Sequence, residues 1–193
     1  MRRIPSVTLL LPLLLATGFA LLSCAPKTPA PAPLSEADQV ARGYYLATIT
    51  GCNDCHTPGY FYGAPDTTRR LSGSELGWKG PWGVSYARNL TPDPQTGIGA
   101  WSEADIVTAI RTGKRPDGSM LLPPMPWPDF AALTDEDATA IAKYLKSLTR
   151  VMHQMPDRVA PGVAVKGSII ELPPPSAWDA PRTPSPPTTP KTP

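Results

Sequence analysis

The pentapeptide Cys52-Asn53-Asp54-Cys55-His56 constrains this chain more than any other feature of its sequence. A Cys-x-x-Cys-His run is the attachment signature of c-type haem. Its two thiols can add across the two vinyl groups on one edge of a porphyrin, and the histidine that follows can bind the iron from below. Thiol redox enzymes and zinc sites also use Cys-x-x-Cys. The motif predicts one covalently bound haem c, anchored by Cys52 and Cys55 with His56 as an iron ligand, and it leaves a reactive dithiol as an alternative.

Residues 1–23 have the pattern of an export signal. Two arginines near the start are followed by an apolar run from Val7 to Leu22, which is shorter than the roughly 20 residues of a membrane span. The run ends in Leu21-Leu22-Ser23-Cys24, which resembles the lipobox of bacterial lipoproteins, where the cysteine is lipidated at cleavage. We expect a lipoprotein-type signal peptide over 1–23 and a lipid on Cys24. An ordinary cleaved signal and an uncleaved anchor are the alternatives.

This interpretation uses all three cysteines of the chain, one for lipid and two for haem. A spare thiol in an exported protein would face oxidation. Lipidation and haem attachment both take place outside the cytoplasm, so we expect the folded part at the periplasmic or other extracytoplasmic face of a bacterial membrane, held there by lipid. The formal charge of +2 equals the two arginines of the signal segment. No basic patch indicates a nucleic-acid partner.

Prolines divide the rest of the chain. Residues 24–34 are rich in proline and small residues, which predicts an extended tether. Residues 173–193 alternate proline with threonine and serine and have too little apolar surface to fold alone. The haem-binding domain is therefore expected at 35–150, followed by a C-terminal strap at 151–172. A domain this small needs a large buried cofactor to complete its core.

Three segments of this domain combine helical capping with helical apolar spacing. They begin at Ser35, Ser102 and Thr134, each followed three residues later by an aspartate, and Gly113 ends the second. Residues 57–100 form a long stretch rich in Gly and Pro, which a compact domain tolerates only if something packs it in place, as a haem would. No strand-like alternation is evident. The predicted fold class is all-α, with about three main helices and long loops around one haem.

The iron needs a second ligand opposite His56, and the candidates are methionines and His153. Met125 lies in Pro123-Pro124-Met125-Pro126-Trp127, where prolines on both sides hold the backbone extended. A stiff segment suits a thioether ligand, because a conformationally free methionine would dissociate readily. The same prolines make the position a poor one for a methionine that merely fills a core. We predict Met125 as the distal ligand, with Met120 and His153 as alternatives.

Several further motifs follow one another in fixed order over residues 40–148. They are Gly43-Tyr44-Tyr45-Leu46, Gly51-Cys52-Asn53-Asp54-Cys55-His56-Thr57-Pro58, Asn89-Leu90-Thr91-Pro92-Asp93, Thr96-Gly97-Ile98-Gly99-Ala100-Trp101-Ser102, Arg115-Pro116-Asp117-Gly118, Pro123-Pro124-Met125-Pro126-Trp127 and Leu133-Thr134-Asp135-Glu136-Asp137. In this order the chain resembles single-haem c-type cytochrome domains of class I. It looks in particular like the domains of cytochrome subunits that serve bacterial membrane-bound dehydrogenases.

The resemblance implies a cytochrome c-type fold, His/Met ligation and one-electron transfer. Carried onto this chain, it assigns the two thioether anchors and the proximal and distal ligands to Cys52, Cys55, His56 and Met125. In such domains a proline carbonyl shortly after the motif often accepts the N–H of the proximal imidazole, and Pro58 is the candidate here. Asn89 and Trp101 are candidates for packing on the haem or bonding its propionates, because both lie in matching motifs.

We interpret the chain as a one-electron carrier and not an enzyme. Its partners are expected to be redox proteins, such as a dehydrogenase, a quinol-oxidising complex or a terminal oxidase. Related subunits often carry three haem domains, whereas this chain has one haem motif, so a free carrier and a complex subunit both stay open. One alternative is a catalytic or ligand-sensing haem with a displaced Met125. The others are a thiol–disulfide oxidoreductase acting through Cys52 and Cys55, and a lipoprotein whose haem only stabilises the fold.

Overall fold

The computed structural model describes residues 34–174. The expected signal peptide, the lipidation site Cys24, most of the tether and the tail beyond residue 174 lie outside the described residues. Over the range 34–174, no helix is both long enough and apolar enough to cross a membrane.

The helices of the described residues include the three that the sequence predicts. In chain order they are α1 (Glu36–Ile49), α2 (Cys52–His56), α3 (Glu103–Thr112), α4 (Trp127–Phe130) and α5 (Asp135–Ser147), with the short 3-10 helices η1 (Tyr60–Tyr62) and η2 (Thr67–Arg69) after α2. The predicted starts of α1, α3 and α5 are confirmed, because Ser35, Ser102 and Thr134 each accept a hydrogen bond from a backbone N–H of the first turn. Gly113 ends α3 in the left-handed conformation, at φ 73°.

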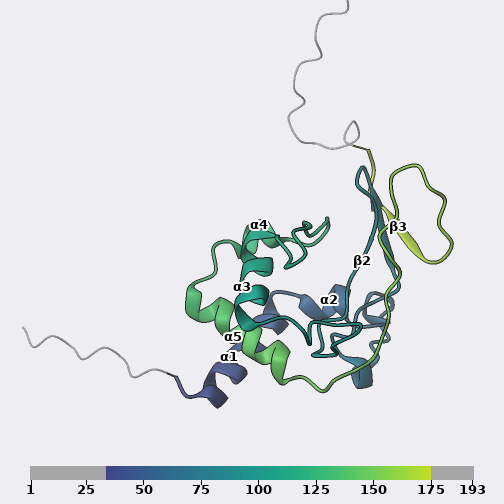
Figure 1. Ribbon diagram of the computed structural model, residues 1–193. Coiled ribbons are helices and arrows are strands. Elements are labelled where there is room, and N and C mark those ends of the chain that lie inside the picture. The colour runs from purple at the N-terminus through teal and green to yellow at the C-terminus, as the bar shows by residue number, and fades with distance from the viewer. Residues whose placement is uncertain (1–33, 175–193) are drawn as a thin grey trace, which may run out of the picture. The chain divides into compact units, whose positions relative to one another are not determined.

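The prediction of an all-α fold is wrong, because the described residues also form a three-stranded mixed sheet. Strands β1 (Gly77–Gly80) and β2 (Gly83–Tyr86) make an antiparallel hairpin, and β3 (Ile169–Glu171) pairs with β1 in parallel. The hairpin strands have four residues each, with glycines at three of their four ends, so alternation is too short to stand out in the sequence. β3 comes from the strap and reaches β1 only through tertiary pairing. In Figure 1 β2 and β3 lie apart from the group formed by α1, α3, α4 and α5.

Helices α1 and α5 cross in close contact at Gly43. A Cβ atom on Gly43 would lie 1.9 Å from the carbonyl oxygen of Ala140, so only glycine permits this approach. Apolar side chains of α1, α3, α5 and the adjoining loops make the core, namely Leu46, Ala47, Leu71, Ile98, Ile106, Ile141, Ala142, Tyr144 and Leu145. Because α1 leads almost directly into α2, the crossing also positions the Cys-x-x-Cys-His motif.

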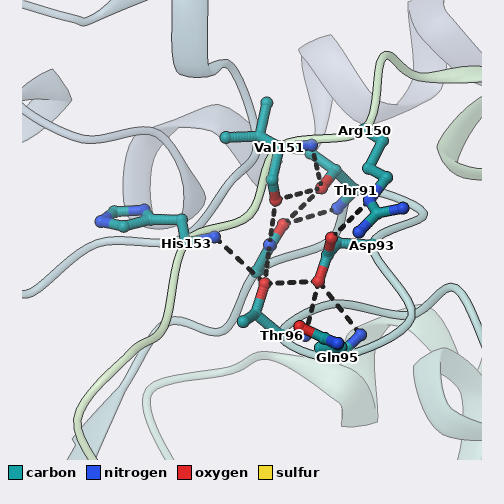
Figure 2. A network of polar contacts seen from close by, with 8 residues as sticks. Thr91, Asp93, Gln95, Thr96, Arg150, Val151 and His153 are labelled. Carbon is teal, nitrogen blue, oxygen red and sulfur yellow. Dashed lines mark hydrogen bonds and ion pairs between the residues drawn. The ribbon is translucent and has the colours of Figure 1, made fainter.

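A buried polar network holds the long stretch 57–100 against the chain that follows α5 (Figure 2). The Asp93 carboxylate is fully buried and accepts hydrogen bonds from the backbone N–H groups of Gln95 and Thr96 at 3.1 and 2.7 Å. It also accepts from Arg150 Nε at 2.7 Å. Asn89 Nδ2 donates to the Val151 carbonyl at 2.8 Å. We expected haem to pack this stretch in place, whereas the protein's own hydrogen bonds supply much of that packing.

Candidate functional site

The Cys-x-x-Cys-His motif forms the one-turn helix α2. Gly51 precedes it in the left-handed conformation, at φ 72°, which lets the chain turn sharply between α1 and α2. Residues three and four apart lie on the same face of a helix, so Cys52, Cys55 and His56 face the same way. All three line one cavity of about 620 Å³.

The walls of this cavity come from segments far apart in the chain. They are mainly apolar and include Ile98, Trp101, Ile106, Ala109, Ile110, Leu121, Leu122, Ile141 and Leu145. Its size and lining are those of a site for a sizeable apolar ligand. The cavity therefore joins the motif to α3, to the segment before α4 and to α5.

The His56 imidazole is oriented by a backbone carbonyl. Its Nδ1 lies 2.7 Å from the carbonyl oxygen of Arg88, and because a carbonyl can only accept, Nδ1 carries the hydrogen and Nε2 keeps its lone pair. Burial lowers the pKa of His56, more than this hydrogen bond raises it. The imidazole is consequently neutral near pH 7, which is the form that binds a metal.

Pro58 does not have the role that the resemblance assigned to it. Its carbonyl accepts from the Asp66 N–H at 2.9 Å, while Arg88 provides the acceptor for His56. Gly59, at φ 76°, turns the chain away immediately after Pro58. A backbone carbonyl has no residue-specific signature, so the position of the Arg88 carbonyl was not visible in the sequence.

The two cysteines are free thiols with poor reactivity of their own. Burial raises the pKa of Cys52, and burial together with the charge of Asp54 raises that of Cys55 to about 11. Thiol–disulfide exchange needs the thiolate, which is a small fraction of either side chain near neutral pH. This electrostatic setting disfavours the thiol–disulfide oxidoreductase.

The predicted distal ligand Met125 lines the same cavity as His56, and so does Met120. Met125 is half-buried, whereas Met120 is 45% exposed. His153 lies outside this cavity, with its Nδ1 3.0 Å from the carbonyl oxygen of Ser72. The cavity thus contains the predicted methionine and one of its two alternatives.

Asn89 and Trp101 also line the cavity. The Asn89 amide is occupied by the polar network, since Nδ2 donates to Thr96 and Val151 and Oδ1 accepts from the Thr91 N–H. Asn89 therefore holds its own loop in place and has no spare donor for a propionate. The Arg115 guanidinium lies 5.9 Å from the centre of the Trp101 ring.

The residues of this cavity fit a covalently attached haem. Two thiols, a neutral imidazole and a thioether lie on an apolar cavity that can take the macrocycle. Three arginines on its wall, Arg88, Arg115 and Arg158, offer positive charge for two carboxylates. Sequence patterns alone did not point to Arg115 and Arg158 as site residues, although Arg115 lies in one of the matching motifs.

Comparison with known proteins agrees with this geometry. The family described as "Cytochrome c" matches residues 40–149. The chain is 40% identical over 108 residues to the "Alcohol dehydrogenase (quinone), cytochrome c subunit" of Gluconobacter oxydans, covering 55% of this chain and 21% of that protein. It is 37% identical over 109 residues to the "Gluconate 2-dehydrogenase cytochrome c subunit" of Pantoea cypripedii, covering 54% of this chain and 22% of that protein. With the "Fructose dehydrogenase cytochrome subunit" of Gluconobacter japonicus, identity is 34% over 120 residues, covering 62% of this chain and 23% of that protein.

The chain spans less than two thirds of the length of each of these relatives, 21% of the first. The family match nevertheless covers more than half of this chain and includes most of α1, the other helices, the motif and most of the cavity wall. The chain therefore belongs to the cytochrome c family, whose domain implies a covalently bound haem c and a role in electron transfer.

Proposed function

We propose that this protein is a one-electron carrier whose haem c is anchored by Cys52 and Cys55 and ligated by His56 and Met125. The observation that carries the proposal is that one apolar cavity of about 620 Å³ gathers all four side chains. When bound, haem supplies a one-electron couple whose potential rises with methionine ligation and with a dry pocket. The chain supplies the rest, namely attachment, axial ligands and exclusion of water.

Each ligand is suited to its task by its local structure. His56 presents an unprotonated Nε2 because Nδ1 is bonded to a carbonyl. Met125 follows Pro124 and precedes Pro126, and its N–H donates to the Leu122 carbonyl at 3.2 Å, so its backbone has little freedom. With both His56 and Met125 bound to the iron, no coordination position would stay open, which favours electron transfer over catalysis or ligand sensing.

The names of the relatives suggest the partners. Proteins named as cytochrome c subunits of alcohol and gluconate dehydrogenases share this domain, so we propose that the chain accepts electrons from a dehydrogenase and passes them to a respiratory partner. We further propose that it is exported and held at a membrane by a lipid on Cys24. On this proposal residues 35–150 form the cytochrome domain and 151–172 a strap.

The test compares Met125→Ala with its neighbour Met120→Ala in protein purified with haem attached. Both methionines line the cavity, so both variants remove a thioether from the same space. We expect the wild-type protein to have a low-spin ferrous spectrum that carbon monoxide does not change. Met125→Ala should bind carbon monoxide and have a lower reduction potential, because thioether ligation favours ferrous iron. Met120→Ala should do neither.

Three other results would contradict the proposal in different ways. The reverse behaviour of the two variants would assign the ligand to Met120. A high-spin ferric spectrum that responds to carbon monoxide in the wild type would favour the catalytic or sensory alternative. A colourless protein, expressed with a working haem-attachment system, would remove the basis for any haem function.

A further inference from the structure

We infer that the strap, residues 151–172, positions His56 by holding in place the Arg88 carbonyl that accepts its ring N–H. The inference rests on the proposed function, since it requires His56 to bind the haem iron. It assigns to the strap, residues 151–172, an effect on the iron that is separate from its packing against the domain.

The first observation is the contact between the two residues. His56 Nδ1 donates to the Arg88 carbonyl oxygen at 2.7 Å, a short and well-formed hydrogen bond. The His56 carbonyl in turn accepts from the Gly73 N–H at 2.7 Å. His56 is thus held at its ring by the Arg88 carbonyl and at its backbone by the Gly73 N–H.

The second observation is that the strap is hydrogen-bonded to residues 88 and 89, the segment that carries the Arg88 carbonyl. Arg88 Nη1 donates to the Met155 carbonyl at 3.2 Å, and Nη2 donates to the Asp157 carboxylate at 3.2 Å. The adjacent Asn89 donates to the Val151 carbonyl at 2.8 Å. The strap therefore contacts the two consecutive residues 88 and 89 at three points, of which only the Asp157 side chain is largely exposed.

The third observation is the tight packing between the strap and Gly73. Met155 is 2% exposed, and a Cβ atom on Gly73 would lie 2.7 Å from its sulfur and 2.9 Å from the Ala87 carbonyl oxygen. The same Ala87 carbonyl accepts from the Ser74 N–H at 3.0 Å. Gly73, Ala87 and Met155 are consequently packed tightly against one another, and Ala87 is joined directly to Arg88.

This arrangement has a chemical consequence for the iron. A hydrogen bond from the second ring nitrogen of a metal-bound histidine makes the imidazole a stronger donor and fixes its orientation. A stronger donor favours ferric iron, so a weaker bond to the Arg88 carbonyl shifts the couple toward the ferrous form. Met155 and Gly73 do not line the cavity. Their effect on the reduction potential would therefore pass through the Arg88 carbonyl and not through contact with the haem.

The test compares Gly73→Ala with Gly63→Ala in the haem-loaded full-length protein. Both glycines have positive φ, 95° and 71°, so both variants strain the backbone. A Cβ at Gly63 has nothing within 4 Å, whereas a Cβ at Gly73 pushes against Met155 and Ala87. We expect Gly73→Ala to raise the ratio of reduced to oxidised haem about threefold at a fixed ambient potential. NMR should show faster exchange of its His56 ring N–H, with Gly63→Ala equal to wild type.

Arg88→Lys gives a second measurement, which decides the matter if Gly73→Ala fails to fold. This substitution keeps the positive charge beside the cavity. It removes the planar guanidinium, which donates to both Met155 and Asp157. We expect the same two changes in the same direction. The exchange rate of the His56 ring N–H is the deciding readout here, because Arg88 also lines the cavity and its charge can act on the haem carboxylates directly. Wild-type potential and exchange rate in the folded variants, with only a lower unfolding temperature, overturn the inference. Absence of covalent haem from the wild-type protein is a distinct result, because it overturns the proposed function itself.

Discussion

Asp93 is a single carboxylate that joins a loop to the chain after α5. A hydrogen bond from the Thr96 backbone N–H, with help from the Thr96 hydroxyl and Arg150, lowers its pKa to about 2 despite burial, which acts in the opposite direction. An aspartate in an unfolded chain has a pKa of about 3.9. The folded state therefore binds fewer protons, so Asp93 contributes stability above about pH 4 that is lost as the pH falls toward 2.

Asp93→Asn should lower the unfolding temperature at pH 7 by several degrees, because an amide cannot serve as a charged acceptor for the four donors around it. It should also flatten the decline of stability between pH 4 and 2. Thermal unfolding followed by circular dichroism over this pH range measures both effects. Asp129→Asn, at an exposed position in α4, is the control and should resemble wild type. If the stability of Asp93→Asn declines between pH 4 and 2 as steeply as that of the wild type, other carboxylates cause the decline.

The helices and strands of this fold differ in how well local sequence patterns predict them. Caps at Ser35, Ser102 and Thr134, together with apolar spacing, were sufficient to predict α1, α3 and α5. The sheet was missed because its strands have three or four residues and because β3 pairs with β1 across a long separation. Short helices such as α4, with four residues, also lack a full period of apolar spacing.

Some parts of the candidate site could likewise be predicted from local sequence, and others depend on tertiary packing. Cys52, Cys55 and His56 are adjacent in the chain, so their joint placement on α2 follows from helical geometry alone. Met125 could be predicted because its prolines mark a stiff segment. The Arg88 carbonyl and the occupied amide of Asn89 depend on which loop packs against which, and no local pattern reports that.

The crossing of α1 and α5 makes Gly43 sensitive to any added atom. Alanine is favoured over glycine by up to about 1 kcal/mol within a helix, yet Gly43→Ala should lower the free energy of unfolding by about 2–3 kcal/mol, because its Cβ meets the backbone of Ala140. Chemical denaturation gives this difference. Ala41→Gly, at an exposed position of the same helix, is the control and should cost only about 1 kcal/mol. A stabilised Gly43→Ala would mean that the helices can separate at no cost.

At the scale of the whole molecule, this chain contains one haem motif and spans about a fifth of its cytochrome-subunit relatives. The proposed lipid on Cys24 would place the domain beside a membrane. An anchor of this kind would keep the domain close to redox partners in the same membrane.

Replacing Cys24 with Ser should release the folded, haem-containing protein from the membrane fraction, because a hydroxyl is not a lipid acceptor in this pathway. Fractionation of cells followed by detection of haem in each fraction makes the measurement. Ser23→Ala keeps a small residue before the cysteine and serves as the control, with membrane retention expected. Membrane retention of Cys24→Ser would show that something other than a lipid on this residue holds the protein.

The close approach at Gly43 also bears on how fast electrons can move. It holds α1 against α5. Helix α1 leads into the thioether anchors, and α5 supplies the cavity wall at Ile141 and Leu145. We expect a cavity held in this way to change little between oxidation states. Little nuclear rearrangement would then accompany each electron, and the reorganisation barrier to transfer would stay low.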